Sequence, residues 1–372
     1  MIKKVYMIID LQYGSTGKGL LAGYLAKQQC PDTVVTAWAA NAGHTYISED
    51  GRKFVHTMLA NGIVSPNLKK VMIGPGSIID TENLYKEMDK CKDLLGTVEI
   101  YIHENAAVIT DEHRKEEDKS MVKIGSTKKG CGAAAIQRIK RDPDNMNTAE
   151  VMQWNNITFR KILRDFRNVS VVKNTTYQQL LDTSEIVAIE GAQGYSLSIY
   201  HGFYPYTTSR DVSTFQILAD CGIPAGWFKY ITIIGTARTF PIRVANRFNE
   251  SGEQVGWSGP CYPDQEEITF ESINQEIELT TVTKLPRRIF TFSVKQIAEA
   301  VRQNKVDKIF LNFANYCPSR DYLSTIIDNI EHVSIGGNVE WLGFGPCHDD
   351  IETKSSLIKE GYFNSEGVSY HE

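Results

Sequence analysis

The sequence from Leu11 to Ala26 reads LQYGSTGKGLLAGYLA and follows directly on a short apolar run. A strand, a glycine-rich loop and a helix in this order are typical of an anion site, because glycines let backbone N–H groups approach a phosphate and the helix N-terminus adds partial positive charge. The loop predicts a phosphate site formed by Gly14, Ser15, Thr16, Gly17, Lys18 and Gly19. It departs from G-x-x-x-x-G-K-[ST], since Gln12 occupies the first glycine position and Gly19 replaces the hydroxyl. The loop also contains no acid.

Outside this stretch the chain alternates apolar, β-branched runs with helical patterns. Strands are expected at Val5–Asp10, Thr33–Trp38, Glu99–His103, Ile186–Glu190, Tyr230–Ile234 and Lys308–Phe313. Helices are expected at Lys18–Gln28, Val212–Cys221, Val294–Gln303, Tyr322–Val333 and Ile351–Glu360. Near-continuous apolar strands between helices indicate the α/β class, with a mostly parallel central sheet and helices on both faces. We expect one unit over residues 1–372, with surface excursions at Asp142–Asn156 and Gly252–Glu267.

Composition excludes several classes of partner. The net charge of −5 without a lysine- or arginine-rich run argues against a nucleic-acid polymer, which needs a concentrated basic face. No apolar run reaches the roughly 18–20 residues of a membrane span, and the N-terminal run is short enough to be a buried first strand, so no membrane partner is expected. The seven cysteines are scattered without CxxC or zinc spacing. They predict reduced thiols in a cytoplasmic protein.

Three further loops carry polar groups, and two of them follow expected strands. Asn41-Ala-Gly-His-Thr45 lies where open α/β sheets bind ligands, and His44 could donate a hydrogen bond to an oxygen that gains negative charge. Gly125-Ser-Thr-Lys-Lys-Gly130 suits phosphate. In Glu190-Gly-Ala-Gln-Gly194, the Gln193 amide could pair with a base edge because it both donates and accepts. Each of these segments, taken alone, is also what an ordinary polar surface loop looks like. Only their combination indicates a ligand-binding site.

A fourth loop, Thr281-Val-Thr-Lys-Leu-Pro-Arg-Arg288, offers hydroxyls and guanidiniums and suits a small dicarboxylate. Together with His201-Gly-Phe-Tyr-Pro-Tyr-Thr-Thr-Ser209 and Gly345-Pro346, these motifs occur in an order that resembles the adenylosuccinate synthetase family over nearly the whole chain. The resemblance implies a purine monophosphate, L-aspartate, a nucleoside triphosphate and Mg²⁺ as reactants and cofactor. In that family the 6-oxo oxygen is phosphorylated, and the aspartate amine then displaces phosphate at C6.

The resemblance also implies a role for each matching position. Catalytic roles fall to Ser15, Lys18, His44 and Gln193, and Mg²⁺ would be bound by Ser15 and the carbonyl of Gly43. The purine monophosphate would contact Ser15, Asn41, Thr127, Lys129, Gln193, Thr208 and, from the second subunit of a homodimer, Arg141. L-Aspartate would contact Thr281, Val282, Thr283 and Arg287. The triphosphate would contact the glycine-rich loop together with Asn312, Asn315, Gly345 and Pro346.

Ser15 stands where these synthetases carry an aspartate that removes the N1 proton of the purine and binds Mg²⁺. A serine hydroxyl is too weak a base for this at neutral pH and is a poorer metal ligand. Guanine differs from hypoxanthine by an amino group at C2, beside N1. Because serine is smaller and can accept a hydrogen bond, the exchange predicts a guanine substrate. The group that removes the N1 proton stays open: Ser15 through a water molecule, or a substrate or donor phosphate.

Two further departures concern the donor and the sugar. Leu311-Asn-Phe-Ala-Asn315 replaces a segment that resembles T-K-L-D, whose aspartate reads the guanine of GTP. Asn312 or Asn315 could instead pair with the amine and a ring nitrogen of adenine, which predicts ATP as the donor. Leu285 replaces an arginine near the substrate sugar, and its loss fits a sugar that lacks the 2′-hydroxyl.

These changes resemble a phage-encoded branch of the family, the 2-aminoadenylosuccinate (N6-succino-2-amino-2′-deoxyadenylate) synthases. The implied reaction joins dGMP to L-aspartate with ATP, for the synthesis of diaminopurine DNA, in the host cytoplasm if the chain is phage-encoded. Two alternatives remain open: a synthetase that uses IMP and GTP and tolerates Ser15, and an inactive homologue that only binds nucleotides. The sequence does not distinguish ATP from dATP.

Overall fold

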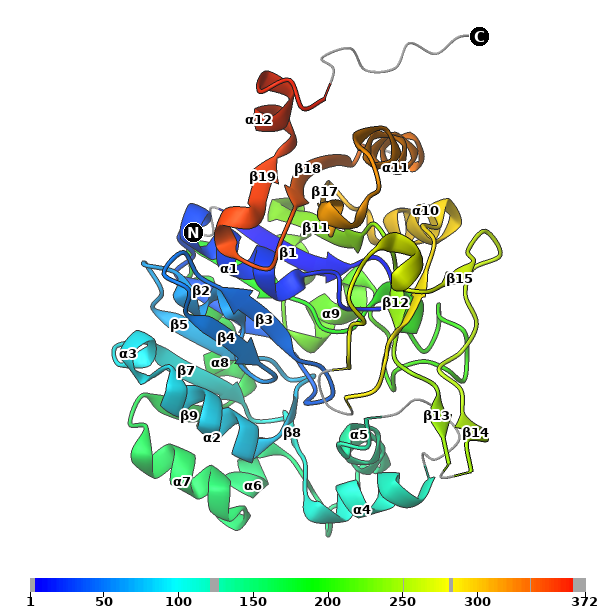
Figure 1. Ribbon diagram of the computed structural model, residues 1–372. Helices are drawn as coiled ribbons and strands as arrows, with labels where there is room; N and C mark the ends of the chain where they lie inside the picture. The colour runs from blue at the N-terminus through cyan, green and yellow to red at the C-terminus, as the bar shows by residue number, and fades with distance from the viewer. Residues whose placement is uncertain (1–3, 121–126, 250, 281–283, 335, 364–372) are drawn as a thin grey trace.

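A computed structural model of the chain describes residues 4–120, 127–249, 251–280, 284–334 and 336–363 (Figure 1). One ten-stranded sheet crosses the molecule. Its strand order is β19 (Ile351–Thr353), β18 (Asn338–Gly343), β17 (Lys308–Asn312), β11 (Ile231–Arg238), β1 (Lys4–Asp10), β10 (Ile186–Glu190), β2 (Thr33–Thr36), β5 (Lys70–Ile73), β7 (Glu99–His103) and β9 (Val169–Val172). Every neighbouring pair is parallel except β18 and β19. The expected class, α/β with a mostly parallel sheet, is confirmed.

Helices cover both faces of this sheet (Figure 1). They are α1 (Lys18–Gln29), α2 (Thr81–Lys90), α3 (Lys92–Leu95), α4 (Asp111–Ser120), α5 (Cys131–Lys140), α6 (Ala149–Asn155), α7 (Ile157–Asp165), α8 (Asn174–Asp182), α9 (Thr214–Asp220), α10 (Val294–Asn304), α11 (Arg320–Val333) and α12 (Lys354–Lys359). Side chains alternate across β1, so Tyr6 and Ile8 join a core with α1, α2 and α7. Val5, Met7 and Ile9 join a second core with α8 to α11.

Among the described residues, short strands form four small sheets beside the main sheet, and short 3₁₀ turns occur in the connections. β3 (His44–Ile47) and β4 (Lys53–His56) form an antiparallel hairpin, and β6 (Ile78–Ile79) pairs with β8 (Ala107–Val108). Two further small sheets contain β12 (Ile242–Arg243), β16 (Arg288–Phe290) and β15 (Glu267–Ile268), and β13 (Arg247–Phe248) with β14 (Gln254–Gly256). The 3₁₀ turns are η1 (Asn61–Val64), η2 (Tyr195–Leu197), η3 (Ala225–Tyr230), η4 (Glu271–Ile273), η5 (Ala314–Tyr316) and η6 (His348–Asp350).

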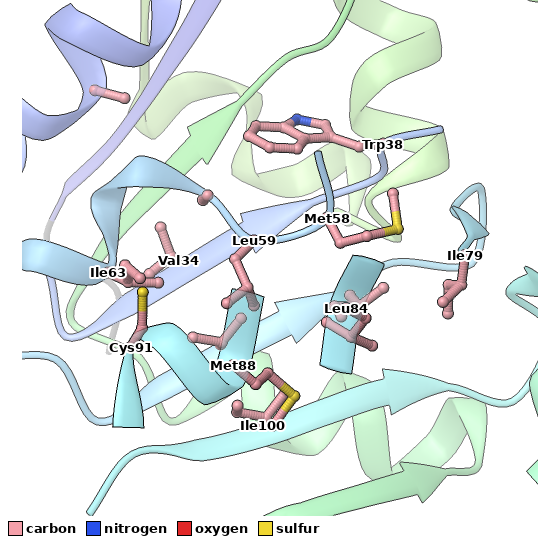
Figure 2. Packing of buried hydrophobic residues seen from close by; sticks show 14 of the residues in the cluster. Val34, Trp38, Met58, Leu59, Ile63, Ile79, Leu84, Met88, Cys91 and Ile100 are labelled. Carbon is pink, nitrogen blue, oxygen red and sulfur yellow. The ribbon is translucent and has the colours of Figure 1, made fainter. Parts of the chain in front are cut away.

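The core beneath α2 shows why this half of the sheet is stable (Figure 2). Leu84 and Met88 of α2 are fully buried and face the residues of β2, β7 and η1. Each such side chain contributes about 1.5–3 kcal/mol by leaving water. Trp38 lies at the upper edge of this core, and its indole N–H donates to the carbonyl of Glu190 at 2.7 Å. The core therefore continues into the segment that carries the polar loops.

One expectation about secondary structure is wrong in part. The expected helix Ile351–Glu360 begins as β19, because Ile351–Thr353 pairs antiparallel with the end of β18. Only Lys354–Lys359 of this range is helical, and the Thr353 side chain caps the helix by accepting the N–H of Ser356 at 3.1 Å. The two expected surface excursions contain short regular elements, α6 within Asp142–Asn156 and β14 within Gly252–Glu267.

Within the described residues, no helix combines the length and apolar character that crossing a membrane requires. All seven cysteines are free thiols, as the scattered spacing predicts.

Candidate active site

The glycine-rich loop connects the end of β1 to the start of α1, as the sequence predicts. Gly14, Ser15 and Gly17 all have positive φ angles, of 94°, 58° and 93°, so the loop turns tightly beneath the helix N-terminus. At Gly17 a Cβ atom would lie 2.2 Å from the Asn312 amide nitrogen, which leaves room only for glycine. The first turn of α1 contains no acidic residue of its own, which suits a helix N-terminus that binds an anion. The Ser15 side chain is exposed at this turn.

A carboxylate that the sequence reasoning missed lies beneath the loop. Asp10 is the last residue of β1, and its Oδ1 accepts the N–H groups of Gln12 at 2.9 Å and Gly14 at 3.2 Å. Its Oδ2 accepts from the Thr16 hydroxyl at 2.5 Å and from Lys18 Nζ at 2.9 Å. The loop has no acid of its own, but the strand before it supplies one to its interior. The groups that donate to Asp10 belong to alternate residues, 12, 14, 16 and 18. The sequence alone does not show that these residues share one acceptor.

His44 is the first residue of β3 and is almost fully buried. Its Nδ1 lies 2.7 Å from Oε1 of Glu190, whose other oxygen accepts the N–H of Asn61 at 2.8 Å. Its ring packs on Trp38 with 4.1 Å between the ring centroids. Burial lowers the pKa of His44, although the hydrogen bond with Glu190 acts in the opposite direction. Because a carboxylate only accepts, the proton of the neutral imidazole lies on Nδ1, and Nε2 can donate only when the ring carries a second proton.

The two loops after β2 and β10 meet at this edge of the sheet. The Gln193 amide donates to Oδ1 of Asn41 at 2.9 Å, so two residues expected at the monophosphate lie together. The glycine loop is adjacent, because a Cβ at Gly194 would lie 2.4 Å from the carbonyl of Gln12. The Ser196 N–H also donates to that carbonyl at 2.9 Å. Asn41, Gln193 and the phosphate loop therefore form one site.

The remaining positions expected at the monophosphate are half-buried and lie at separate loops. Thr127 and Lys129 precede α5, and Cys131 at the start of this helix hydrogen-bonds with the backbone of Ala40. This contact places the start of α5 beside the loop after β2. The Thr208 N–H donates to the last residue of η2 at 2.7 Å, close to the loop after β10. Among the described residues, no hydrogen bond joins these three side chains to that of Asn41 or Gln193.

Arg141 caps the C-terminus of α5 in a left-handed conformation with φ of 54°. It is exposed, and no ion pair joins it to the described part of its own chain. Two apolar side chains of the same helix, Ile136 and Ile139, are 47% and 73% exposed. Contiguous exposed apolar patches mark sites of protein contact, whereas single exposed apolar side chains are common on any surface.

Asn312 and Asn315 have different environments at the end of β17. Asn312 is buried, its Oδ1 accepts the N–H of Phe313 at 2.8 Å, and its Nδ2 donates to the carbonyl of Thr16 at 3.4 Å. Its amide therefore braces the phosphate loop. Asn315 is exposed in η5. Of the two residues expected to read a donor base, Asn315 has the amide that faces outward.

Gly345 and Pro346 follow β18, next to β17. Oδ2 of Asp350 accepts the N–H of Cys347 at 2.7 Å and would lie 2.4 Å from a Cβ at Gly345. Asp350 thus holds this loop in a closed turn, with Pro346 exposed at its tip.

Thr281, Val282 and Thr283 lie outside the described residues. Arg287, expected at the aspartate site, is partly buried; its N–H donates to the carbonyl of Glu278 at 2.9 Å. Burial also lowers the pKa of Arg287, although the nearby Glu278 carboxylate raises it.

Glu278 also pairs with Arg238, a residue that the sequence reasoning missed. Arg238 ends β11, is fully buried, and donates through Nη2 to Oε1 of Glu278 at 2.5 Å. Its Nη1 lies 3.4 Å from the carbonyl of Ser15, and its guanidinium stacks 3.7 Å from the centroid of the Phe313 ring. Although burial raises the pKa of Glu278, the Arg238 guanidinium holds it below its usual value. The pair links the phosphate loop to the segment before residues 281–283.

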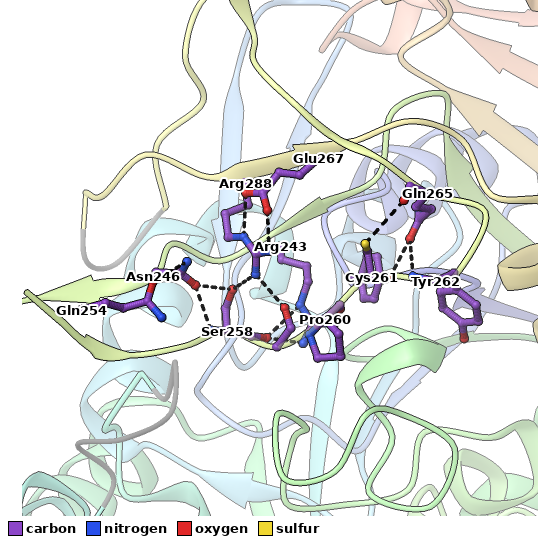
Figure 3. A network of polar contacts seen from close by, with 12 residues as sticks. Arg243, Asn246, Gln254, Ser258, Pro260, Cys261, Tyr262, Gln265, Glu267 and Arg288 are labelled. Carbon is purple, nitrogen blue, oxygen red and sulfur yellow. Dashed lines mark hydrogen bonds and ion pairs between the residues drawn. The ribbon is translucent and has the colours of Figure 1, made fainter.

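Arg288 follows Arg287 in the chain, and its guanidinium binds residues of its own small sheet and of a neighbouring loop (Figure 3). It pairs with Glu267 at 2.6 Å and donates to the Ser258 hydroxyl at 2.9 Å. Arg243 donates to the Ser258 carbonyl and lies 4.6 Å from the ring centroid of Tyr13 in the phosphate loop. Within the described part of the chain, the side chain of Arg287 has fewer partners than that of Arg288, and its Nε donates to the carbonyl of Leu279 at 3.3 Å.

At Ser15 and Gly43, the positions expected to bind Mg²⁺, the available ligand atoms are neutral oxygens. Both residues are exposed, so a hydroxyl and a backbone carbonyl face outward. The carboxylate beneath the loop, that of Asp10, has no exposed surface and already accepts four hydrogen bonds. This set fits Mg²⁺ that is held mainly by phosphate oxygens and water, the usual mode for nucleotide-bound magnesium.

Comparison with known proteins agrees with this geometry. The adenylosuccinate synthetase family model matches residues 7–165 and 144–326. The N6-succino-2-amino-2′-deoxyadenylate synthase of Acinetobacter phage SH-Ab 15497 is 49% identical over 95% of this chain and 94% of its own length. The adenylosuccinate synthetase of Methanococcus aeolicus is 32% identical over 94% and 99%.

A solved structure of the cyanophage S-2L succinoaminodeoxyadenylate synthetase, bound to dGMP and to dATP as an energy donor, has a TM-score of 0.87 and 43% identity. The match covers 98% of this chain and all of that one. This chain is therefore more similar to the phage synthases than to the archaeal synthetase. The family match and these identities show that the chain belongs to the adenylosuccinate synthetase family.

Proposed function

We propose that this chain is a carbon–nitrogen ligase that joins dGMP and L-aspartate at the expense of ATP. The products are N6-succino-2-amino-2′-deoxyadenylate, ADP and phosphate. The observation that carries the proposal is the exposed hydroxyl of Ser15, held in a left-handed turn between two glycines at the position where the family motif has an acid. The names of the phage relatives and the dGMP in the cyanophage structure support it.

The reaction has two steps. The O6 oxygen of dGMP attacks the γ-phosphorus of ATP, the bond to ADP breaks, and the N1 proton leaves. The aspartate amine then attacks C6, the C6–O bond breaks and phosphate departs, while the amine loses a proton. Lys18 and the loop N–H groups stabilise the transferring phosphoryl group, and His44, as the imidazolium, donates from Nε2 to O6 as it gains charge. The Glu190 carboxylate accepts from Nδ1–H and stabilises the imidazolium that this donation requires.

Recognition of guanine depends on Ser15. Its hydroxyl accepts a hydrogen bond from the 2-amino group, which hypoxanthine lacks. Asn41 and Gln193, bonded to each other at 2.9 Å, contact the same nucleotide together with Thr127, Lys129 and Thr208. Leu285 in place of an arginine leaves the sugar's 2′ position without a polar partner, which favours deoxyribose. L-Aspartate binds at Arg287 and the adjoining residues 281–283.

ATP binds with its base between the Gly345–Pro346 turn and Asn315, whose exposed amide pairs with adenine. The dATP in the cyanophage relative supports an adenine base in this position. Mg²⁺, held by phosphate oxygens with the Ser15 hydroxyl and the Gly43 carbonyl, would neutralise negative charge on the triphosphate. The chain acts as a homodimer in which Arg141 of one subunit reaches the substrate phosphate of the other, and the exposed Ile136 and Ile139 support a protein contact at that helix. The free thiols support action in the cytoplasm.

A substrate matrix tests this proposal. Four purine monophosphates (dGMP, GMP, IMP and dIMP) are combined with ATP, dATP, GTP and dGTP, and aspartate-dependent phosphate release is measured. The proposal requires the highest kcat/KM with dGMP and an adenine triphosphate. Preference for IMP with GTP would identify an ordinary adenylosuccinate synthetase. Nucleotide binding by calorimetry without phosphate release would identify an inactive homologue.

A further inference from the structure

One carboxylate organises the whole phosphate loop. Asp10 accepts hydrogen bonds from the alternate residues Gln12, Gly14, Thr16 and Lys18, two on each carboxylate oxygen. Its side chain has no exposed surface, and that of Lys18 is 6% exposed. The contact between Asp10 and Lys18 is therefore a buried ion pair directly under the segment that holds a transferring phosphoryl group. The family motif has its acid at position 15, whereas here the acid lies five residues earlier, in the strand.

A chain of hydroxyl groups supports the same carboxylate. The Thr16 hydroxyl lies 2.5 Å from both Oδ2 of Asp10 and the hydroxyl of Thr236 in β11. A carboxylate accepts, so the Thr16 hydroxyl donates to Asp10. The Thr236 hydroxyl lies within hydrogen-bond distance of two acceptors, the Thr16 oxygen and the carbonyl of Ile9 at 3.1 Å. Loss of the Asp10 carboxylate would therefore affect the loop and the neighbouring strand together.

We propose that Asp10 is a positioning residue for phosphoryl transfer that acts through Lys18. The carboxylate fixes the place of the Lys18 ammonium and the turn of the loop, so that both meet the γ-phosphoryl group in the geometry of the transition state. Asp10 does not remove the N1 proton, because each of its oxygens already has two donors and the side chain is closed to solvent. The inference rests on the proposed role of Lys18 at the phosphates.

A double-mutant cycle tests it with D10N, K18M and the double variant D10N/K18M. D10N retains an acceptor for the loop N–H groups but presents an NH₂ group, or a weaker neutral acceptor, to Lys18. We expect kcat to fall at least about tenfold while the KM for the purine monophosphate stays within about threefold. If Asp10 acts through Lys18, the double variant is no slower than K18M alone. Multiplicative losses in kcat would overturn the proposal.

D32N is the matched control, because it tests whether the loss of any buried carboxylate lowers kcat. Asp32 is 3% exposed, accepts the N–H of Glu185 at 2.9 Å, and lies at the opposite end of the strands. D32N should lower the melting temperature and leave kcat unchanged; an equal loss of kcat in D32N would contradict the proposal. If D10N does not fold, D10E takes its place, because it keeps the charge and moves it by one methylene, and the same non-additivity with K18M is required.

The cycle uses whichever monophosphate and triphosphate the unmodified chain turns over fastest. A preference for nucleotides other than dGMP and ATP would overturn the proposed substrates and would still allow the coupling between Asp10 and Lys18 to be measured. Additive behaviour with dGMP and ATP would overturn the role of Asp10 and leave the proposed reaction in place.

Discussion

Nδ1 of His44 and Oε1 of Glu190 lie 2.7 Å apart in a buried pair, and the second oxygen of Glu190 accepts the N–H of Asn61. This arrangement predicts the effect of E190Q. The Gln carbonyl keeps the bond from Asn61, so its NH₂ group donates to Nδ1 of His44, and the negative charge that stabilises the imidazolium is lost. Nε2 of the neutral ring keeps its proton but donates it without a positive charge, and kcat should fall at least about tenfold. The measurement is steady-state phosphate release, with the KM for dGMP expected to change little.

Glu87 provides the control for E190Q. It is a buried carboxylate that accepts N–H groups of Thr57, Met58 and Leu59, and no hydrogen bond joins it to His44 among the described residues. E87Q should reduce stability and retain kcat. Equal kcat in E190Q and the unmodified chain would remove Glu190 from the mechanism.

The second prediction concerns Ser15. S15D keeps a residue type that tolerates the left-handed conformation, so the loop is expected to fold. The larger side chain crowds the 2-amino group, and the ratio of kcat/KM for dGMP over dIMP should fall at least about tenfold. S15A should reduce the same ratio by about tenfold, because only dGMP loses a hydrogen bond. An unchanged ratio in both variants would mean that Ser15 does not read the base.

Much of the site follows from sequence, and the missing part has a physical reason. The phosphate loop was predictable because a strand, glycines, a lysine and a helix are contiguous. Glu190 belongs to a recognised motif, but its bond to His44 joins residues 146 positions apart. Arg238 and Glu278 also lie far from the loop in sequence. Arg238 comes close to the loop because β11 pairs with β1 in the sheet, and Glu278 is joined to the loop by its ion pair with Arg238. Contacts set by sheet order leave no local pattern, so the sequence could not reveal them.

The third prediction compares two asparagines that sequence alone treats as equivalent. N315D should raise the ratio of kcat/KM for GTP over ATP at least about tenfold, because a carboxylate accepts from both N1–H and N2–H₂ of guanine. N312D is the matched control. Asn312 is buried and braces the carbonyl of Thr16, so its substitution should lower kcat with either donor and leave the ratio unchanged. A shift of the ratio in N312D alone would reverse the assignment.

The fourth prediction uses a buried histidine outside the site. Burial lowers the pKa of His56 to about 4, and the neighbouring His44, Lys90 and Arg52 act in the same direction. A group with a lowered pKa in the fold takes up its proton first in the unfolded chain, so stability is lost as the pH falls below about 6.5. Between pH 7 and pH 5 the loss from His56 should be about 2 kcal/mol. H56F, which has no charged form, should show a flatter pH dependence in urea unfolding; parallel curves would contradict this.

The fifth prediction tests whether two subunits share each site. If Arg141 reaches the partner's substrate phosphate, R141A and K18M are strongly impaired for different reasons and can complement each other. A mixed dimer has one site with both defects and one site with neither. Random exchange of equal amounts makes half of the dimers mixed, so activity should return to about a quarter of that of the unmodified chain. R141D mixed with R141A is the control, because no combination restores the arginine. Failure to complement, with subunit exchange demonstrated by labelled chains, would place Arg141 in its own subunit's site or outside the site altogether.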